Sequence, residues 1–247
     1  MSSDRRPVDQ IREASIQKLS TKAGRALRFR VLPGLSEKEL REFAIELEFP
    51  LLSDLSSDIV ELLKEAGGVE LEGVGLVDFR GREMSIETGF RSTPILHDGC
   101  GNFWVVDIAA DGNWGCVLYW CHDPPVAVIQ AENLAAFFEQ VFNLGRDPHI
   151  DVLAEMRNVT AHRIWAEDPF LIQSSKARSS DDPALRAFAA RLPEDYVFVD
   201  LRNREVGSGF SWGKSEDPIE RDGENLLFAI RIDVKPKRGL LSRLFGR

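Results

Sequence analysis

The chain has 247 residues, of which 43% are hydrophobic and 29% are charged, an ordinary composition for a globular protein. Its formal net charge is −9, and no stretch approaches the roughly 18 apolar residues of a membrane span. The first residues lack the apolar segment of a secretory signal, and the three cysteines form no disulfide framework. We therefore expect a soluble, cytoplasmic protein.

The charge is distributed unevenly along the chain. Residues 1–34 hold eight basic and three acidic residues, residues 35–145 hold six and twenty, and residues 235–247 hold five basic residues and no acidic one. The acidic middle would repel phosphates over a Debye length of about 10 Å. We therefore expect no nucleic acid on the main body, whereas a cationic protein would be attracted to it.

The first elements are expected to be helices. Residues 8–30 carry weakly periodic apolar positions, and Ser36-x-x-Glu39 is a capping box that opens the next helix. A third helix is expected to begin near Ser57 and to stop at Gly67-Gly68, where a left-handed cap is available. The apolar stripe of the second helix consists of Leu40, Phe43, Ala44 and Leu47.

The middle of the chain is typical of a sheet followed by a helix. Residues 69–79 alternate as a strand pair, and two β-branched and aromatic runs flank the turn-forming Asp111-Gly112-Asn113, which predicts a β-hairpin. Residues 126–129 follow as a short strand. Residues 132–144 then have a wide apolar face that would cover one face of the sheet, an α+β arrangement.

Further elements are expected after residue 145, in a smaller α+β extension. They are a helix within 150–165, a mobile linker or surface loop over 173–182, a helix from Pro183 to Leu192, a strand over 196–201 with Gly209–Trp212 as its partner, and a last strand over 226–234. The tail, residues 235–247, is basic and amphipathic. We expect a solvated end, with docking on a membrane surface as the alternative.

The centre of the chain also carries a family resemblance. Asp98-Gly-Cys-Gly-Asn102, the following aromatic-hydrophobic-hydrophobic-Asp107 and the Gly-x-Val-x-x-Trp-x-His-Asp of residues 115–123 resemble the centre of the SMI1/KNR4 domain of the SUKH superfamily. A helix that ends in Gly-Gly before the first strand is similar to that family too. The family's usual Leu-Pro-x-x-Tyr is replaced by Asp54-Leu-Ser-Ser.

The resemblance covers about residues 36–145 and implies a SUKH-like antiparallel sheet packed against helices. Together with the charge pattern it divides the chain into four parts. We predict a basic, helical N-terminal segment (1–35), the SMI1/KNR4-like domain (36–145), an α+β extension (146–234) and a basic tail (235–247).

The sequence contains no motif typical of a catalytic site or a metal site. Cys100, Cys116, Cys121, His97 and His122 lie in or beside the hairpin, but no Cys-x₂-Cys pair is present. Because they are five apart on one strand, Cys116 and Cys121 should point to opposite faces. We expect no metal, no cofactor and no catalytic residue, and hence no enzyme. A small hydrolase or transferase that uses Cys100 or His122 is the alternative.

The resemblance implies a protein-binding function. Many bacterial members of the family resemble immunity proteins that neutralise a toxin, and fungal relatives are linked to cell-wall synthesis signalling. Our leading hypothesis is an immunity protein that binds a basic toxin domain; a regulator or scaffold is the alternative. The residues expected to bind the partner surround the hairpin, where Trp114 is expected to be exposed at the tip: Asp98, Asp107, Asp111, Trp114 and Asp123.

Overall fold

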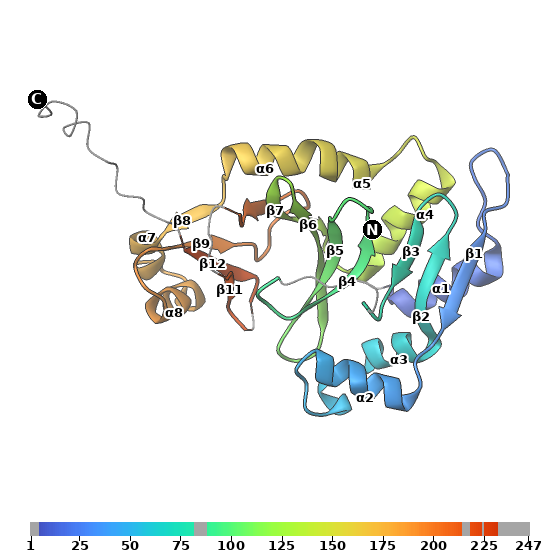
Figure 1. The fold of residues 1–247 in the computed structure, drawn as a ribbon, viewed down its shortest axis with the longest axis horizontal. Helices are drawn as coiled ribbons and strands as arrows, with labels where there is room; N and C mark the ends of the chain where they lie inside the picture. The colour runs from blue at the N-terminus through green and yellow to red at the C-terminus, as the bar shows by residue number, and fades with distance from the viewer. Residues whose placement is uncertain (1–4, 82–87, 214–217, 224, 232–247) are drawn as a thin grey trace, which may run out of the picture.

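The computed structural model describes residues 5–81, 88–213, 218–223 and 225–231. The predicted tail (235–247) lies outside these ranges. Within them the chain forms three antiparallel sheets with helices packed around them, so the predicted α+β fold is confirmed (Figure 1). None of the described helices is long and apolar enough to cross a membrane.

The N-terminal part contains a three-stranded sheet in the order β1-β2-β3. Its elements are α1 (Pro7–Gln17), β1 (Phe29–Pro33), α2 (Glu37–Glu46), the 3₁₀ turn η1 (Leu52–Asp54), α3 (Ser57–Glu65), β2 (Ala66–Leu71) and β3 (Gly75–Asp78). The capping box is present, with Ser36 and Glu39 bonding each other's backbone N–H. The helix predicted over 8–30 is shorter, since it ends at Gln17 and β1 follows.

The Gly67-Gly68 pair does not cap α3, contrary to the prediction. Both glycines lie in β2 and are buried. A Cβ on Gly68 would come 2.6 Å from the carbonyl oxygen of Val77, and one on Gly67 would come 2.5 Å from that of Pro33. The pair is therefore needed because the neighbouring strands approach too closely for a side chain.

The central sheet has five strands in the order β10-β7-β6-β5-β4. They are β4 (Ser92–His97), β5 (Phe103–Ile108), β6 (Trp114–His122), β7 (Pro125–Ala131) and β10 (Gly209–Ser211), and α4 (Leu134–Arg146) follows β7. The predicted hairpin is β5–β6, in which Phe103 pairs with Trp120 and Val105 with Leu118. One strand of this sheet, β10, comes from the C-terminal extension and pairs with β7. The prediction that Gly209–Trp212 pairs with the strand at 196–201 is therefore wrong.

Both faces of the central sheet are buried, against different layers. Trp104 and Tyr119 lie on the face that packs against α4, in one core with Phe137 and Phe138. Leu118 and other side chains of the opposite face share a second core with the C-terminal sheet. The helix face alone was predicted to be covered, so the second layer is a finding of the structure.

The C-terminal part supplies that second layer. Its sheet has the order β11-β12-β9-β8, and a third core lies between this sheet and its own helices. The elements are α5 (Val152–Glu155), the π turn η2 (Met156–Thr160), α6 (Ala161–Glu167), β8 (Leu171–Gln173), α7 (Ser174–Arg178), α8 (Pro183–Arg191), β9 (Tyr196–Asp200), β11 (Glu220–Arg221) and β12 (Leu227–Arg231). Residues 174–178 form a helix with Ala177 fully buried, so the predicted mobile linker there is wrong.

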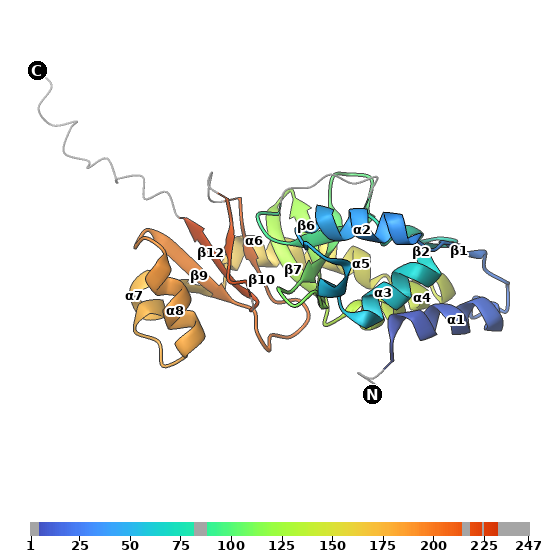
Figure 2. The ribbon, with the colours of Figure 1, turned by 90° about the horizontal axis from the view of Figure 1, so that it is seen from below.

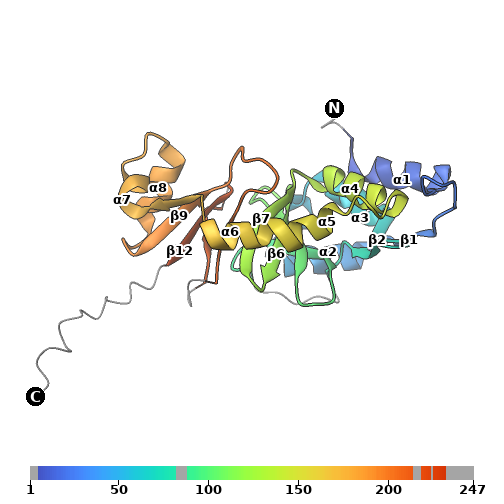
Figure 3. The ribbon, with the colours of Figure 1, turned by 90° about the horizontal axis from the view of Figure 1, so that it is seen from above.

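The helices lie on opposite sides of the molecule. Figure 2 shows α2 and α3 on the side seen from below, and Figure 3 shows α5 and α6 running past β6 and β7 on the side seen from above. The central hairpin therefore has one end towards α2 and the other towards α5.

Candidate functional site

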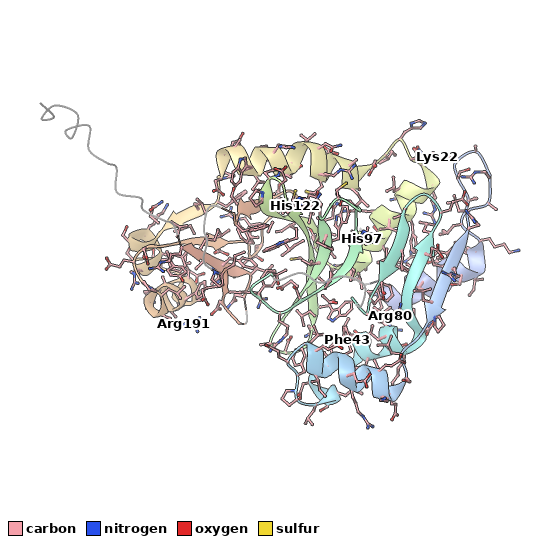
Figure 4. All side chains as sticks on the ribbon, in the orientation of Figure 1. Lys22, Phe43, Arg80, His97, His122 and Arg191 are labelled. Atoms are coloured by element: carbon pink, nitrogen blue, oxygen red, sulfur yellow. The ribbon has the colours of Figure 1, made fainter. Side chains whose placement is uncertain are left out.

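The residues predicted to bind a partner lie at the two ends of the hairpin and, for Asp107, inside β5. Asp98 and Asp123 flank the end of β6 at His122, whereas Asp111 and Trp114 lie at the tip. The nine residues of β6 separate these ends, a span of roughly 25–30 Å at about 3.3 Å per residue. Figure 4 shows His97 and His122 at one end, and Phe43, the neighbour of Trp114, on the opposite side. The five residues do not form one patch.

Asp98 is occupied by its own turn. Its side chain is only 3% exposed. It accepts hydrogen bonds from the backbone N–H of Cys100 (2.8 Å) and Asn102 (3.2 Å) and from the Asn102 amide (2.7 Å). Partial burial raises the pKa of this carboxyl, but the hydrogen bonds and the charge of Arg157, 3.8 Å away on η2, outweigh it, so the pKa lies below its usual range. Asp98 thus holds the loop between β4 and β5 in shape.

The two histidines at this end also serve the turns. His97 Nδ1 accepts the backbone N–H of Gly99 at 3.1 Å, and His122 Nδ1 lies 2.9 Å from Asn102 Oδ1. The His122 ring packs beside Gly101, whose φ of +88° and close approach (a Cβ there would be 3.2 Å from the ring) both favour glycine. Asn102 also accepts the His122 backbone N–H, at 3.0 Å. These contacts link the loop to the end of β6.

Asp107 is buried inside the protein and does not reach the surface. Its carboxylate accepts a hydrogen bond from Arg221 of β11 at 2.9 Å, and the side chains are only 4% and 6% exposed. Burial raises the pKa of Asp107, and the Arg221 charge offsets part of this effect. The expectation that Asp107 lies on a partner-binding surface does not fit this position. The residue ties β5 to the C-terminal sheet.

At the hairpin tip, Asp111 is exposed and Trp114 is half-buried. Asp111 accepts the backbone N–H (3.0 Å) and side-chain amide (2.8 Å) of Asn113, which lower the pKa of its carboxyl. The Trp114 ring packs against Phe43 of α2, with centroids 6.4 Å apart. The exposed Trp114 that was predicted is therefore largely a core contact, and Asp111 remains at the surface.

The tip rests directly on η1. The Gly112 carbonyl accepts the backbone N–H of Ser56 at 3.3 Å. A Cβ on Gly112 would come 2.0 Å from the carbonyl oxygen of Asp54, so only glycine fits, and its φ of +75° requires glycine as well. The hairpin tip and the α2–η1 segment therefore form one continuous surface.

Two of the three cysteines are buried within the fold. Cys116 and Cys121 are buried in different cores, on opposite faces of the sheet as predicted, and burial raises the pKa of both thiols. Cys100 is exposed in the Asp98 loop. Among the described residues, no three His, Cys, Asp or Glu side chains lie where they could hold a metal ion.

Sequence reasoning missed one feature, the surface of α2 and η1. The exposed fractions of Ile45 and Leu51 are 65% and 62%, unusually high for large apolar side chains. The charge pattern could have indicated this surface, because residues 37–65 hold nine acidic and three basic residues. The apolar stripe of α2 was assigned correctly to the core, but Ile45 lies outside it.

Known proteins were compared with the chain. The model of the SMI1/KNR4 family (SUKH-1) matches residues 34–140, and no curated protein and no solved structure matches. The matched segment runs from just before α2 into α4 and includes the hairpin, the Asp98 loop and the Gly67-Gly68 pair. Residues 34–140 of this chain are thus an SMI1/KNR4 (SUKH-1) family domain.

Proposed function

We propose that this protein is a non-enzymatic protein-binding module, an immunity-type protein of the cytoplasm that binds and neutralises a basic toxin domain. The observation that carries the proposal is the family domain over residues 34–140, in a segment whose acidic residues outnumber its basic ones by twenty to six. Proteins of the SUKH family commonly act as immunity proteins.

The charge supports a cationic protein as the partner. Carboxylates on a surface raise the association rate of a positively charged partner, and they repel nucleic-acid phosphates. Asp111 and Asp123 are exposed and contribute to this field, whereas Asp107 does not because Arg221 neutralises it inside the protein. The carboxylates that steer the partner are therefore those of the exposed loops and helices.

The positions of the cysteines and histidines support a role in structure over catalysis. Two of the three thiols are buried with raised pKa values, and His97 and His122 are engaged by loop groups. A nucleophile would need an activating base and an accessible thiolate. These residues have the contacts of turn and core groups instead.

Co-expression with a toxin domain tests the proposal. The probe is a basic toxin-like C-terminal domain encoded by the reading frame next to this gene. We expect this protein to restore growth of cells that express the domain, and to bind it with an affinity that falls as salt rises from about 0.05 to 0.5 M. Failure to restore growth, or binding that is independent of salt, would contradict the proposal.

A further inference from the structure

We propose that α2, η1 and the hairpin tip form the surface that receives the basic partner. We define the α2–η1 surface by six exposed residues: Glu42, Ile45, Glu46, Glu48, Leu51 and Asp111. The inference rests on the proposed function, because it locates the partner of that function on the molecule.

The proposal rests first on the exposed apolar side chains of this surface. Ile45 and Leu51 lie on either side of a turn closed by the hydrogen bond from Phe49 N–H to the Ala44 carbonyl, 2.9 Å long. This bond reverses the chain directly after α2, and η1 packs against α2. Exposed side chains of this size are costly to hydrate, and when several lie on neighbouring elements they are typical of a protein interface.

A groove continues from these residues along α3. It has a volume of about 820 Å³, and its apolar lining residues Leu52, Leu55 and Val60 lie among the polar Ser53, Ser57, Glu61, Lys64 and Glu65. The groove is wide open, a shape that suits a protruding segment of a protein better than an enclosed small molecule. Leu52 follows Leu51 directly, so the groove and the apolar pair adjoin.

The charges around the groove differ between its two sides. On the α1 side, Glu61 is engaged by Arg6 (2.7 Å) and Arg12 (3.1 Å), and Arg12 also pairs with Glu65. On the α2 side, the carboxylates of Glu42 and Glu46 are exposed, with Glu42 3.6 Å from Lys38. A cationic partner is therefore directed towards α2 and the hairpin tip, where Asp111 adds a further charge.

In the described part of the chain, the faces of the central sheet offer no open apolar surface. One face of the central sheet packs against α4, and the C-terminal sheet covers the other. Ile150 (48%) and Val206 (45%) are exposed in loops, and the most exposed of the other large apolar side chains, Ile16 (80%) and Val159 (60%), lie on α1 and η2. These last two provide matched controls, because they are equally exposed but lie away from the acidic surface.

The test uses a defined probe, a fluorescent amphipathic helical peptide of lysine and leucine, with an all-lysine peptide of the same length for comparison. We expect the lysine–leucine peptide to bind more tightly than the all-lysine peptide. The double variant Ile45→Ser/Leu51→Ser should weaken its binding at least about tenfold, because two apolar contacts are lost. The control variant Ile16→Ser/Val159→Ser should change it less than about twofold.

A second pair of variants tests the charges. Glu42→Gln/Glu46→Gln should weaken binding about three- to tenfold at low salt and reduce its salt dependence. Glu194→Gln/Glu205→Gln removes the same charge from exposed positions of the C-terminal part and should have a smaller effect. Hydrogen exchange of the unmodified protein should show protection of residues 45–54 by the peptide, a readout that needs no variant.

Each outcome separates this inference from the proposed function. Peptide binding that is absent, or that both apolar double variants weaken equally, overturns the α2–η1 surface. If the neighbouring toxin domain is neutralised equally by wild type and Ile45→Ser/Leu51→Ser, the surface assignment fails and the immunity function stands. If no toxin is neutralised but the peptide protects residues 45–54, the surface stands and the immunity function fails.

Discussion

Each end of the central hairpin has an aspartate in a turn, but the two aspartates differ in their exposure to solvent. At the His122 end, Asp98 is 3% exposed, and backbone and amide donors of its own loop occupy it. At the tip, Asp111 is exposed, and the next residue, Gly112, packs on Asp54 of η1. Asp98 is enclosed by its own loop, whereas Asp111 faces solvent on the surface that we propose receives the partner.

The difference shows that a carboxylate's place in the sequence does not determine whether it contributes to a surface. Asp107 and Asp111 are only four residues apart, yet the first is buried against Arg221 and the second is in solvent. A sheet strand alternates its faces, and in this protein both faces are covered. In the central sheet, charge therefore reaches solvent mainly from the loops, whereas β1 and β2 of the N-terminal sheet expose Arg30 and Glu70.

The largest expected effect concerns Asp107. Arg221→Ala should lower the free energy of unfolding by about 3–5 kcal/mol, because it leaves a buried carboxylate without its cation. Urea unfolding followed by fluorescence would measure it. Arg231→Ala is the control, since its pair with Asp195 is exposed and should contribute less than about 1 kcal/mol. Equal losses in the two variants would contradict a structural role for the buried pair.

A smaller loss is expected at the His122 end of the hairpin. Asp98→Ala should cost about 2–3 kcal/mol, because the N–H groups of Cys100 and Asn102 lose their acceptor. Asp123→Ala, at an exposed position of the same end, should cost less than about 0.5 kcal/mol. The same unfolding measurement serves both. If Asp98→Ala is as mild as Asp123→Ala, the Asp98 loop is not held by this carboxylate.

The pH dependence of stability should distinguish Asp98 as well. The pKa of the Asp98 carboxyl is lower in the folded protein than in the unfolded chain, where an Asp has a pKa of about 3.9. The stability it contributes is therefore present above that pH and is lost as the pH falls through the folded pKa. The difference in unfolding free energy between wild type and Asp98→Asn should stay constant above about pH 5 and shrink as the pH falls below about 4, towards the folded pKa. A difference that stays constant would contradict the lowered pKa.

Much of the fold could be predicted because the local signals are strong. The capping box at Ser36, the alternating strands of the hairpin and the apolar face of α4 each appear as expected. The family signature of residues 98–123 coincides with the Asp98 loop and the hairpin, where turn hydrogen bonds and glycine conformations constrain the residue types. These features depend on neighbours within a few residues.

The features that were missed depend on residues far apart in the sequence. β10 joins β7 across about 80 positions, and the Asp107–Arg221 pair spans 114. No local pattern in residues 209–211 specifies which strand they pair with. Likewise, a charged residue such as Asp107 is expected at the surface, and only Arg221 and the covering sheet make its burial possible. The candidate surface was missed because exposure of Ile45 is a tertiary property.

A small effect on stability is also expected at Asp111, in contrast to the loss expected at Asp98. Asp111→Asn should change the free energy of unfolding by less than about 1 kcal/mol, because an amide oxygen can still accept the Asn113 N–H at an exposed turn. Removing its charge should still weaken binding of the lysine–leucine peptide about twofold at low salt, and this effect should vanish at high salt. Asp123→Asn removes a charge at the opposite end of β6, more than a Debye length away, and should leave peptide binding unchanged. Equal effects of the two substitutions would mean that the peptide responds to net charge alone, and that the hairpin tip has no special part in binding.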